Sequence, residues 1–155
     1  MTTTEHHRTS LTSHLLAEIS SPKELPCLSL YQPTHRRHPE NQQDPIRFRN
    51  LLKRLETSLR QRYPAADAEA LLEPFEALGR DADFWNHAQD GLAVLGGPGL
   101  FRAVRLPEPV NELVVVADSF HTKPLRRLLQ SADRYQVLGL SLGAVRLFEG
   151  NRHGL

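Results

Sequence analysis

The residues best suited to chemistry lie in a polar loop at positions 35–44, which contains histidine, arginine, amide and carboxyl side chains. His35 and His38 have a spacing that metal ions use, but a metal site normally needs a third and a fourth ligand, for which only Glu40 and Asp44 are near. We therefore predict no metal site. A loop that ends at a helix start can instead hold an anion, because free backbone N–H groups face outward there. The candidate anion-binding residues are His35, His38, Gln43 and Asp44.

A basic helix is expected directly after this loop, and its charge suggests a polyanionic partner. Between His35 and Arg62 the sequence has eight Lys or Arg against three Asp or Glu, whereas from Tyr63 to Asp133 it has six against eleven. The net charge of only +1 therefore conceals a basic part and an acidic part. Such cations bind RNA through its phosphate backbone and shape, although a solvated helix face is the open alternative. The predicted RNA-contacting residues are Arg36, Arg37, Arg47, Arg49, Lys53 and Arg54.

Two other motifs resemble catalytic signatures, but the sequence favours structural roles for both. Asp118, Ser119 and His121 have the residue types of a hydrolytic triad, yet triads are assembled in space and no oxyanion-hole motif accompanies these residues. Asp118 or Ser119 is better explained as the cap of the helix that follows. Residues 96–99, GGPG, lack the Gly-Lys-Ser/Thr ending of a phosphate loop and are predicted to be a hairpin turn. We therefore predict no catalytic residue and no cofactor.

The elements that must position these residues alternate between helical and extended patterns. Asp44 as N-cap and Pro45 as first residue signal the start of the basic helix. The apolar residues of this helix recur at helical spacing, namely Phe48, Leu51, Leu52, Leu55 and Leu59. The run at 113–117 is apolar throughout, which is typical of a central strand. Further helices are expected at 9–20, 66–78 and 118–131 with a helical turn at 81–89, and further strands at 27–31, 92–95, 100–106, 136–140 and 144–149.

This pattern predicts an α/β fold of the two-layer, α+β-like type, with a small mixed β-sheet of about four strands backed by helices. A C-terminal β-hairpin follows these elements. A single cysteine excludes a disulfide framework and a cysteine-based zinc site. No segment approaches the roughly 18 apolar residues that span a bilayer. The N-terminus has no apolar signal region, so we expect a cytoplasmic protein without a membrane partner.

Several segments, in the same order, resemble the bacterial relatives of the eukaryotic and archaeal class-I peptide chain release factor. They are SLYQPTHR, QQDPIRFRNLL, a Phe-Trp turn before DGLAVL, PEPVNELVVVADSFHTKPLRRLL and YQVLGLSLGAVRLFEG. The resemblance implies a release-factor-like N-terminal domain at 25–133, preceded by a tail and a short helix at 1–24. It also implies that residues 134–155 are the truncated start of an RNase H-like middle domain. In this family the N-terminal domain enters the ribosomal decoding site, and the middle domain carries the GGQ loop that promotes peptidyl-tRNA hydrolysis.

Two motifs of the release factors are missing from this sequence. The codon-reading NIKS motif is replaced by QDPIRF at positions 43–48, and no GGQ occurs. The resemblance without these motifs implies a non-catalytic domain that binds ribosomal or transfer RNA, in translation stress or ribosome rescue. Weak self-association through the C-terminal hairpin is a further expectation. Two alternatives stay open: a small phosphorylated-ligand-binding protein or enzyme that uses the 35–44 loop, and a protein–protein interaction domain.

Overall fold

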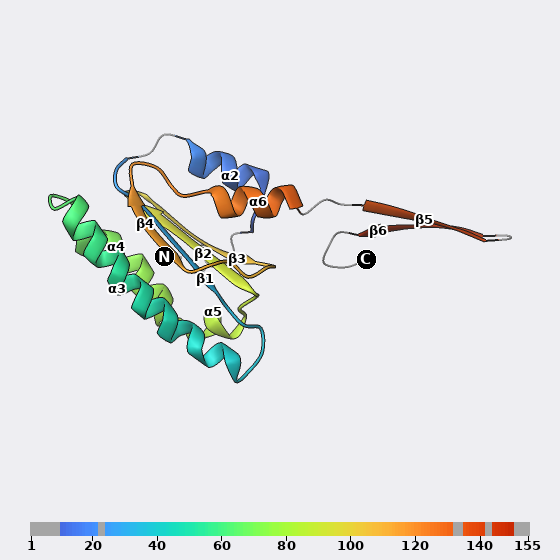
Figure 1. Cartoon of the computed structure of the whole chain (residues 1–155), viewed down its shortest axis with the longest axis horizontal. Helices are drawn as coiled ribbons and strands as arrows, with labels where there is room; N and C mark the ends of the chain where they lie inside the picture. Colours follow the sequence, from blue (N-terminus) through green and yellow to red (C-terminus); the bar gives the residue numbers. More distant parts are fainter. Residues whose placement is uncertain (1–9, 22–23, 132–134, 142–143, 151–155) are drawn as a thin grey trace.

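The chain folds around one β-sheet that carries helices on both faces (Figure 1). The computed structural model describes residues 10–21, 24–131, 135–141 and 144–150, with side chains described in the first two ranges. The sheet has the order β3-β2-β1-β4 and every neighbouring pair is antiparallel. Its strands are β1 (Cys27–Pro33), β2 (Gly91–Gly97), β3 (Leu100–Leu106) and β4 (Leu113–Ala117). The predicted small α/β fold is confirmed.

One face of the sheet is covered by α3 (Asp44–Arg62), α4 (Ala68–Gly79) and α5 (Ala82–Asn86) (Figure 1). The predicted apolar stripe of α3 is buried at every position. It packs on the side chains of alternate strand residues such as Leu28 and Leu30, as the period of two along a strand requires. This core holds α3 rigidly against the sheet.

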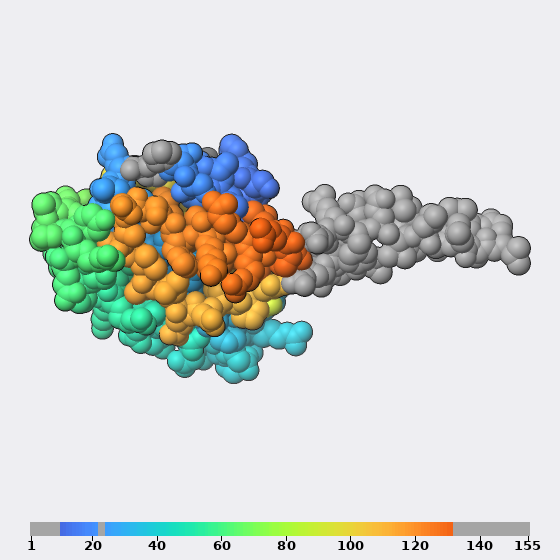
Figure 2. Space-filling view, turned by 45° about the horizontal axis from the view of Figure 1, so that its top comes forward, coloured from blue at the N-terminus to red at the C-terminus, as the bar shows by residue number. Residues whose placement is uncertain are grey.

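The opposite face of the sheet is covered by α2 (Ser13–Ser20) and α6 (Lys123–Ser131). Figure 2 shows α2, in blue, lying against α6, in orange. The remaining strand residues point to this side, so a second core forms there around Tyr31, Leu95 and Leu125. The helices therefore make three layers with the sheet between them, where the sequence predicted two.

The sheet also differs from the prediction in its strand directions and in the place of β4. It is antiparallel throughout and not mixed, and β4 pairs only with β1, so it is an edge strand and not a central one. The apolar run at 113–117 was misleading because both faces of this edge are covered: Val116 enters the first core and Leu113 packs against the second. Nη1 of Arg62 donates to the carbonyl oxygen of Val116 at 2.9 Å, which gives one backbone acceptor of this edge strand a hydrogen-bond partner.

The helix and turn boundaries refine several predictions. Helix α2 begins at Ser13, with the Thr12 hydroxyl accepting the N–H of Leu15. Helix α6 begins at Lys123, so the prediction that Asp118 or Ser119 caps it is wrong. The predicted four-residue hairpin loop is shorter, because Gly97 pairs with Leu100 and only residues 98–99 connect β2 to β3.

The C-terminal hairpin is confirmed as a two-stranded antiparallel sheet of its own, formed by β5 (Tyr135–Ser141) and β6 (Ala144–Gly150). Of the predicted Ser-Leu-Gly turn at 141–143, Ser141 belongs to β5 and pairs with Ala144. Residues 142–143 and the N-terminal tail at 1–9 lie outside the described residues. Self-association through this hairpin stays a prediction. Within the described part of the chain, no helix is both long enough and apolar enough to cross a membrane.

Replacing Gly96 with alanine should destabilise this fold, because the new Cβ would lie 2.5 Å from Cε2 of Phe75. Phe75 is fully buried and packs edge-on against Phe101, with 5.2 Å between ring centroids. We expect Gly96→Ala to lower the free energy of unfolding by about 1–3 kcal/mol in urea denaturation. The double variant Gly96→Ala/Phe75→Leu should lose less than the sum of the two single losses, and strict additivity would contradict this contact.

Candidate functional site

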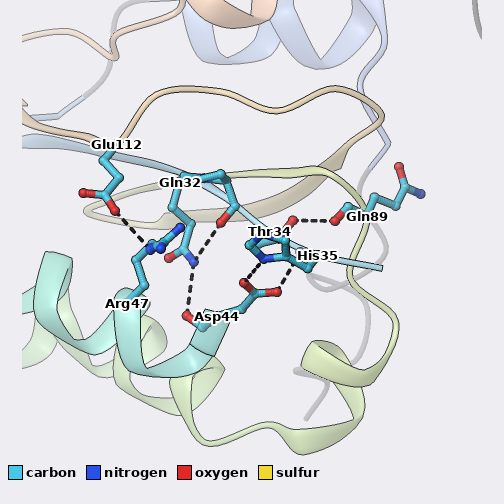
Figure 3. A network of polar contacts seen from close by, with 8 residues as sticks. Gln32, Thr34, His35, Asp44, Arg47, Gln89 and Glu112 are labelled. Carbon is cyan, nitrogen blue, oxygen red and sulfur yellow. Dashed lines mark hydrogen bonds and ion pairs between the residues drawn. The ribbon is translucent and has the colours of Figure 1, made fainter. Parts of the chain in front are cut away.

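The junction between β1 and α3 is built around the carboxylate of Asp44, which is 0% exposed. Oδ2 of Asp44 accepts the backbone N–H of His35 at 2.8 Å, and Oδ1 lies 2.8 Å from Nδ1 of the same histidine (Figure 3). Both bonds are needed here because an unpaired buried carboxylate is costly. The carboxylate thus closes the 35–44 loop. Its predicted role as N-cap is wrong, since α3 begins at Asp44 after Gln43 and the carboxylate turns to His35.

A second set of hydrogen bonds fixes the end of β1 (Figure 3). Nε2 of Gln32 donates to the carbonyl oxygen of Asp44 at 3.1 Å. The hydroxyl of Thr34 donates to the carbonyl oxygen of Gln89 at 2.7 Å. The backbone N–H of Thr34 donates to the carbonyl oxygen of Asp90 at 3.0 Å. The sequence predicts no role for Gln32 or Thr34, and the only signal for them is two polar residues at the end of an apolar strand. They connect the loop to α3 and to the segment before β2.

The four candidate anion-binding residues do not form one cluster. His35 and Asp44 are paired, whereas His38 lines a cavity together with Arg80. Gln43 lies at a different hollow, on the other side of the start of α3. Among the described residues, no three His, Cys, Asp or Glu side chains gather into a group that could hold a metal ion.

The six predicted RNA-contacting residues divide into paired and unpaired cations. Nε of Arg36 lies 2.7 Å from Oδ1 of Asp90, and Nε of Arg47 lies 3.1 Å from Oε1 of Glu112. These partly exposed ion pairs contribute little stability, but they neutralise the two cations. The other four are exposed and have no ion partner within residues 10–21 and 24–131, namely Arg37, Arg49, Lys53 and Arg54.

Helical geometry places the cations of α3 in two rows along its flanks. Arg47 and Arg54, seven residues apart, line a hollow of about 290 Å³ that also contains Glu112. Arg49 and Lys53, four residues apart, follow Pro45 along the other flank. The two C-terminal arginines of α3 already have partners in the fold. Arg60 pairs with Glu56 at 2.9 Å, and Arg62 donates to the carbonyl oxygen of Val116 in β4. The unpaired cations of α3 therefore all lie between residues 49 and 54, in the middle of the helix.

The catalytic-like motif at 118–121 is divided between two parts of the surface. Asp118 and Ser119 line one hollow, whereas His121 lines another. The backbone N–H of His121 donates to Oγ of Ser29 at 3.0 Å, and its carbonyl oxygen accepts the hydroxyl of Tyr31. Burial raises the pKa of Tyr31, which keeps its hydroxyl protonated as a donor. These contacts anchor the loop before α6 to the sheet.

Comparison with known proteins gives little beyond this geometry. No family model matches the chain, and no curated protein is significantly similar to it in sequence. A solved structure described as "Archaeal protein" is 20% identical, with a TM-score of 0.38. The alignment covers 90% of the present chain and 44% of the archaeal one, so this chain spans less than half of that protein's length. At this TM-score the likeness does not establish a common fold.

Removing the carboxylate of Asp44 should weaken the fold at the β1–α3 junction. We expect Asp44→Ala to lower the free energy of unfolding by about 1–3 kcal/mol, because the N–H of His35 loses its acceptor. Asp44→Asn should lose less, since its amide oxygen can still accept that N–H. Urea denaturation of both variants would measure this, with Glu40→Ala as an exposed control in the same loop. Equal stability of Asp44→Ala and Glu40→Ala would show that the bonds to His35 do not hold the junction.

Proposed function

We propose that this chain is a non-catalytic, release-factor-like domain that binds ribosomal or transfer RNA through the unpaired cations of α3. The observation that carries this proposal is the group of exposed cations with no ion partner among the described residues. Cations of this kind release the counterions of a nucleic acid when they contact phosphates, which drives binding. The proposal includes a cytoplasmic location and a role in translation stress or ribosome rescue, as the sequence resemblance suggests.

The packing of α3 supports this role because it fixes the cations in space. The stripe that includes Phe48, Leu51 and Leu55 is buried against the sheet, so the helix cannot rotate to hide its charged flanks. Neighbours four residues apart on a helix lie about 5–6 Å from each other. An RNA strand along this helix would therefore meet Arg49 and Lys53 in succession. Binding of this kind reads the RNA backbone and needs no catalytic group.

Neutralising either free cation should weaken RNA binding and its salt dependence. We expect Arg49→Gln and Lys53→Gln each to reduce the slope of log K against log salt by about one, because each removes one phosphate contact. Sedimentation with ribosomes and anisotropy with labelled transfer RNA would measure the slopes. Arg127→Gln on α6, an exposed arginine on the opposite face of the sheet, is the matched control. Absence of any association even at low salt would overturn the proposed function.

Removing the carboxylate that pairs with Arg47 should have the opposite effect. We expect Glu112→Gln to strengthen RNA binding by about two- to fivefold, because the guanidinium becomes available for a phosphate. Glu69→Gln on α4 makes the same change in net charge at an exposed position and should have a smaller effect. The measurement is the affinity for transfer RNA at fixed salt. Weaker binding by Glu112→Gln would show that the ion pair itself organises the RNA-binding surface.

A further inference from the structure

We propose that the cavity beside the start of α3 binds a single unstacked nucleotide. The cavity has a volume of about 410 Å³, within the range of small-molecule sites. Its wall comes from four segments: the loop after β1, the 3-10 helix η1 (Glu40–Gln43), the start of α3, and the α4–α5 turn with α5. The nucleotide belongs either to the RNA held by α3, in which case the inference rests on the proposed function, or to a free ligand.

The wall of this cavity has the chemistry of a nucleotide site. Asn41, Gln42 and Asn86 supply amide groups, which both donate and accept hydrogen bonds and so match the edges of a base. Arg80 and His38 are exposed at the same cavity, and the guanidinium of Arg80 has no ion partner in the described part of the chain.

Carboxylates are absent from the described wall of this cavity, which favours an anionic ligand. Four comparable hollows each include at least one carboxylate among their lining residues, namely Asp118, Asp67, Glu112, and Glu108 together with Glu112. The acidic residues next to lining residues in sequence are Glu40 and Asp83, which are exposed, together with Asp44 and Asp81. The carboxylate of Asp44 is engaged by His35, and that of Asp81 accepts the N–H of Phe84 at 3.1 Å. A phosphate at Arg80 would therefore meet no carboxylate in the wall itself.

One wall is a fixed aromatic surface. Trp85 lines the cavity but is only 5% exposed, and its Nε1 donates to the carbonyl oxygen of Leu78 at 2.9 Å. Its ring packs against Phe48 and Phe84, with centroid distances of 5.3 and 5.2 Å. The ring is therefore held in place, and only a small part of it is accessible to a ligand. The cavity is preformed, which lowers the entropic cost of binding.

Helical geometry places two of the unpaired cations of α3, Arg49 and Lys53, on the flank of the helix that borders the cavity. Pro45 lines it, and Arg49 and Lys53 follow on the same flank at intervals of one helical turn. If one base of an RNA single strand occupied the cavity, the neighbouring phosphates of that strand would lie near Arg49 and Lys53. The sequence predicted contacts to the backbone alone, whereas this arrangement adds a place for one base.

The only tryptophan of the chain stands in the wall of the cavity, so its fluorescence reports directly on occupancy. Hexauridylate and hexaadenylate should change the Trp85 emission in a saturable manner. A labelled RNA duplex should bind, by anisotropy, without that change. Asn86→Ala and Arg80→Gln should each weaken the affinity for the single strands by about tenfold. Arg127→Gln should bind like the unmodified protein, and circular dichroism would confirm that every variant is folded.

The possible failures of this inference and of the proposed function are distinct. Normal RNA binding with unchanged Trp85 emission and no effect of Asn86→Ala would overturn the nucleotide site alone. A response to UMP or AMP without RNA binding would support the site, assign it to a free nucleotide and overturn the proposed function. An equal response to inorganic phosphate would overturn base recognition. No response to any of these probes would overturn both.

Discussion

The buried carboxylate of Asp44 is the constraint on which the proposed RNA-binding surface depends. Its two contacts with His35 close a loop of ten residues and determine where α3 starts relative to the end of β1. The stripe that begins at Phe48 then sets the rotation of the helix by burying one side of it. Because start and rotation are both fixed, the positions of the cations and of the cavity wall follow from them.

The local elements could be predicted from sequence because their signals are local. The apolar stripe of α3 and the residues of the hairpins stand close together along the chain, and they appear where the pattern places them. The edge position of β4 could not be predicted, because its only partner in the sheet, β1, is far away in sequence and its apolar side chains pack on both faces. The sequence likewise predicts Asp44 to be the cap of the helix that follows it, whereas its carboxylate contacts His35 at the start of the preceding loop.

The candidate site also combines features that the sequence predicts with features that only the fold reveals. Composition identifies the basic residues, but only the fold reveals that Arg47 and Arg36 are paired, since Glu112 and Asp90 come from distant segments. The amide-lined cavity also could not be predicted from the sequence, because residues as far apart along the chain as Asn41 and Asn86 form its wall. Such a site has no motif that a linear pattern could carry.

The segment at 43–48, which the sequence resemblance aligns with the codon-reading motif of the release factors, serves mainly to hold the fold. Two of its six side chains, Asp44 and Phe48, are fully buried and hold the fold, and Arg47 is paired with an acid. Only Gln43 and Ile46 are exposed without such a role. Two of the unpaired cations, Arg49 and Lys53, and the amide-lined cavity instead lie along the flank of α3 opposite to Arg47. Phosphate contacts there would supply affinity that falls with salt, whereas amide contacts would discriminate between bases. Because both lie on one flank, a single strand could engage them together, and of the 43–48 segment only Pro45 lines the cavity.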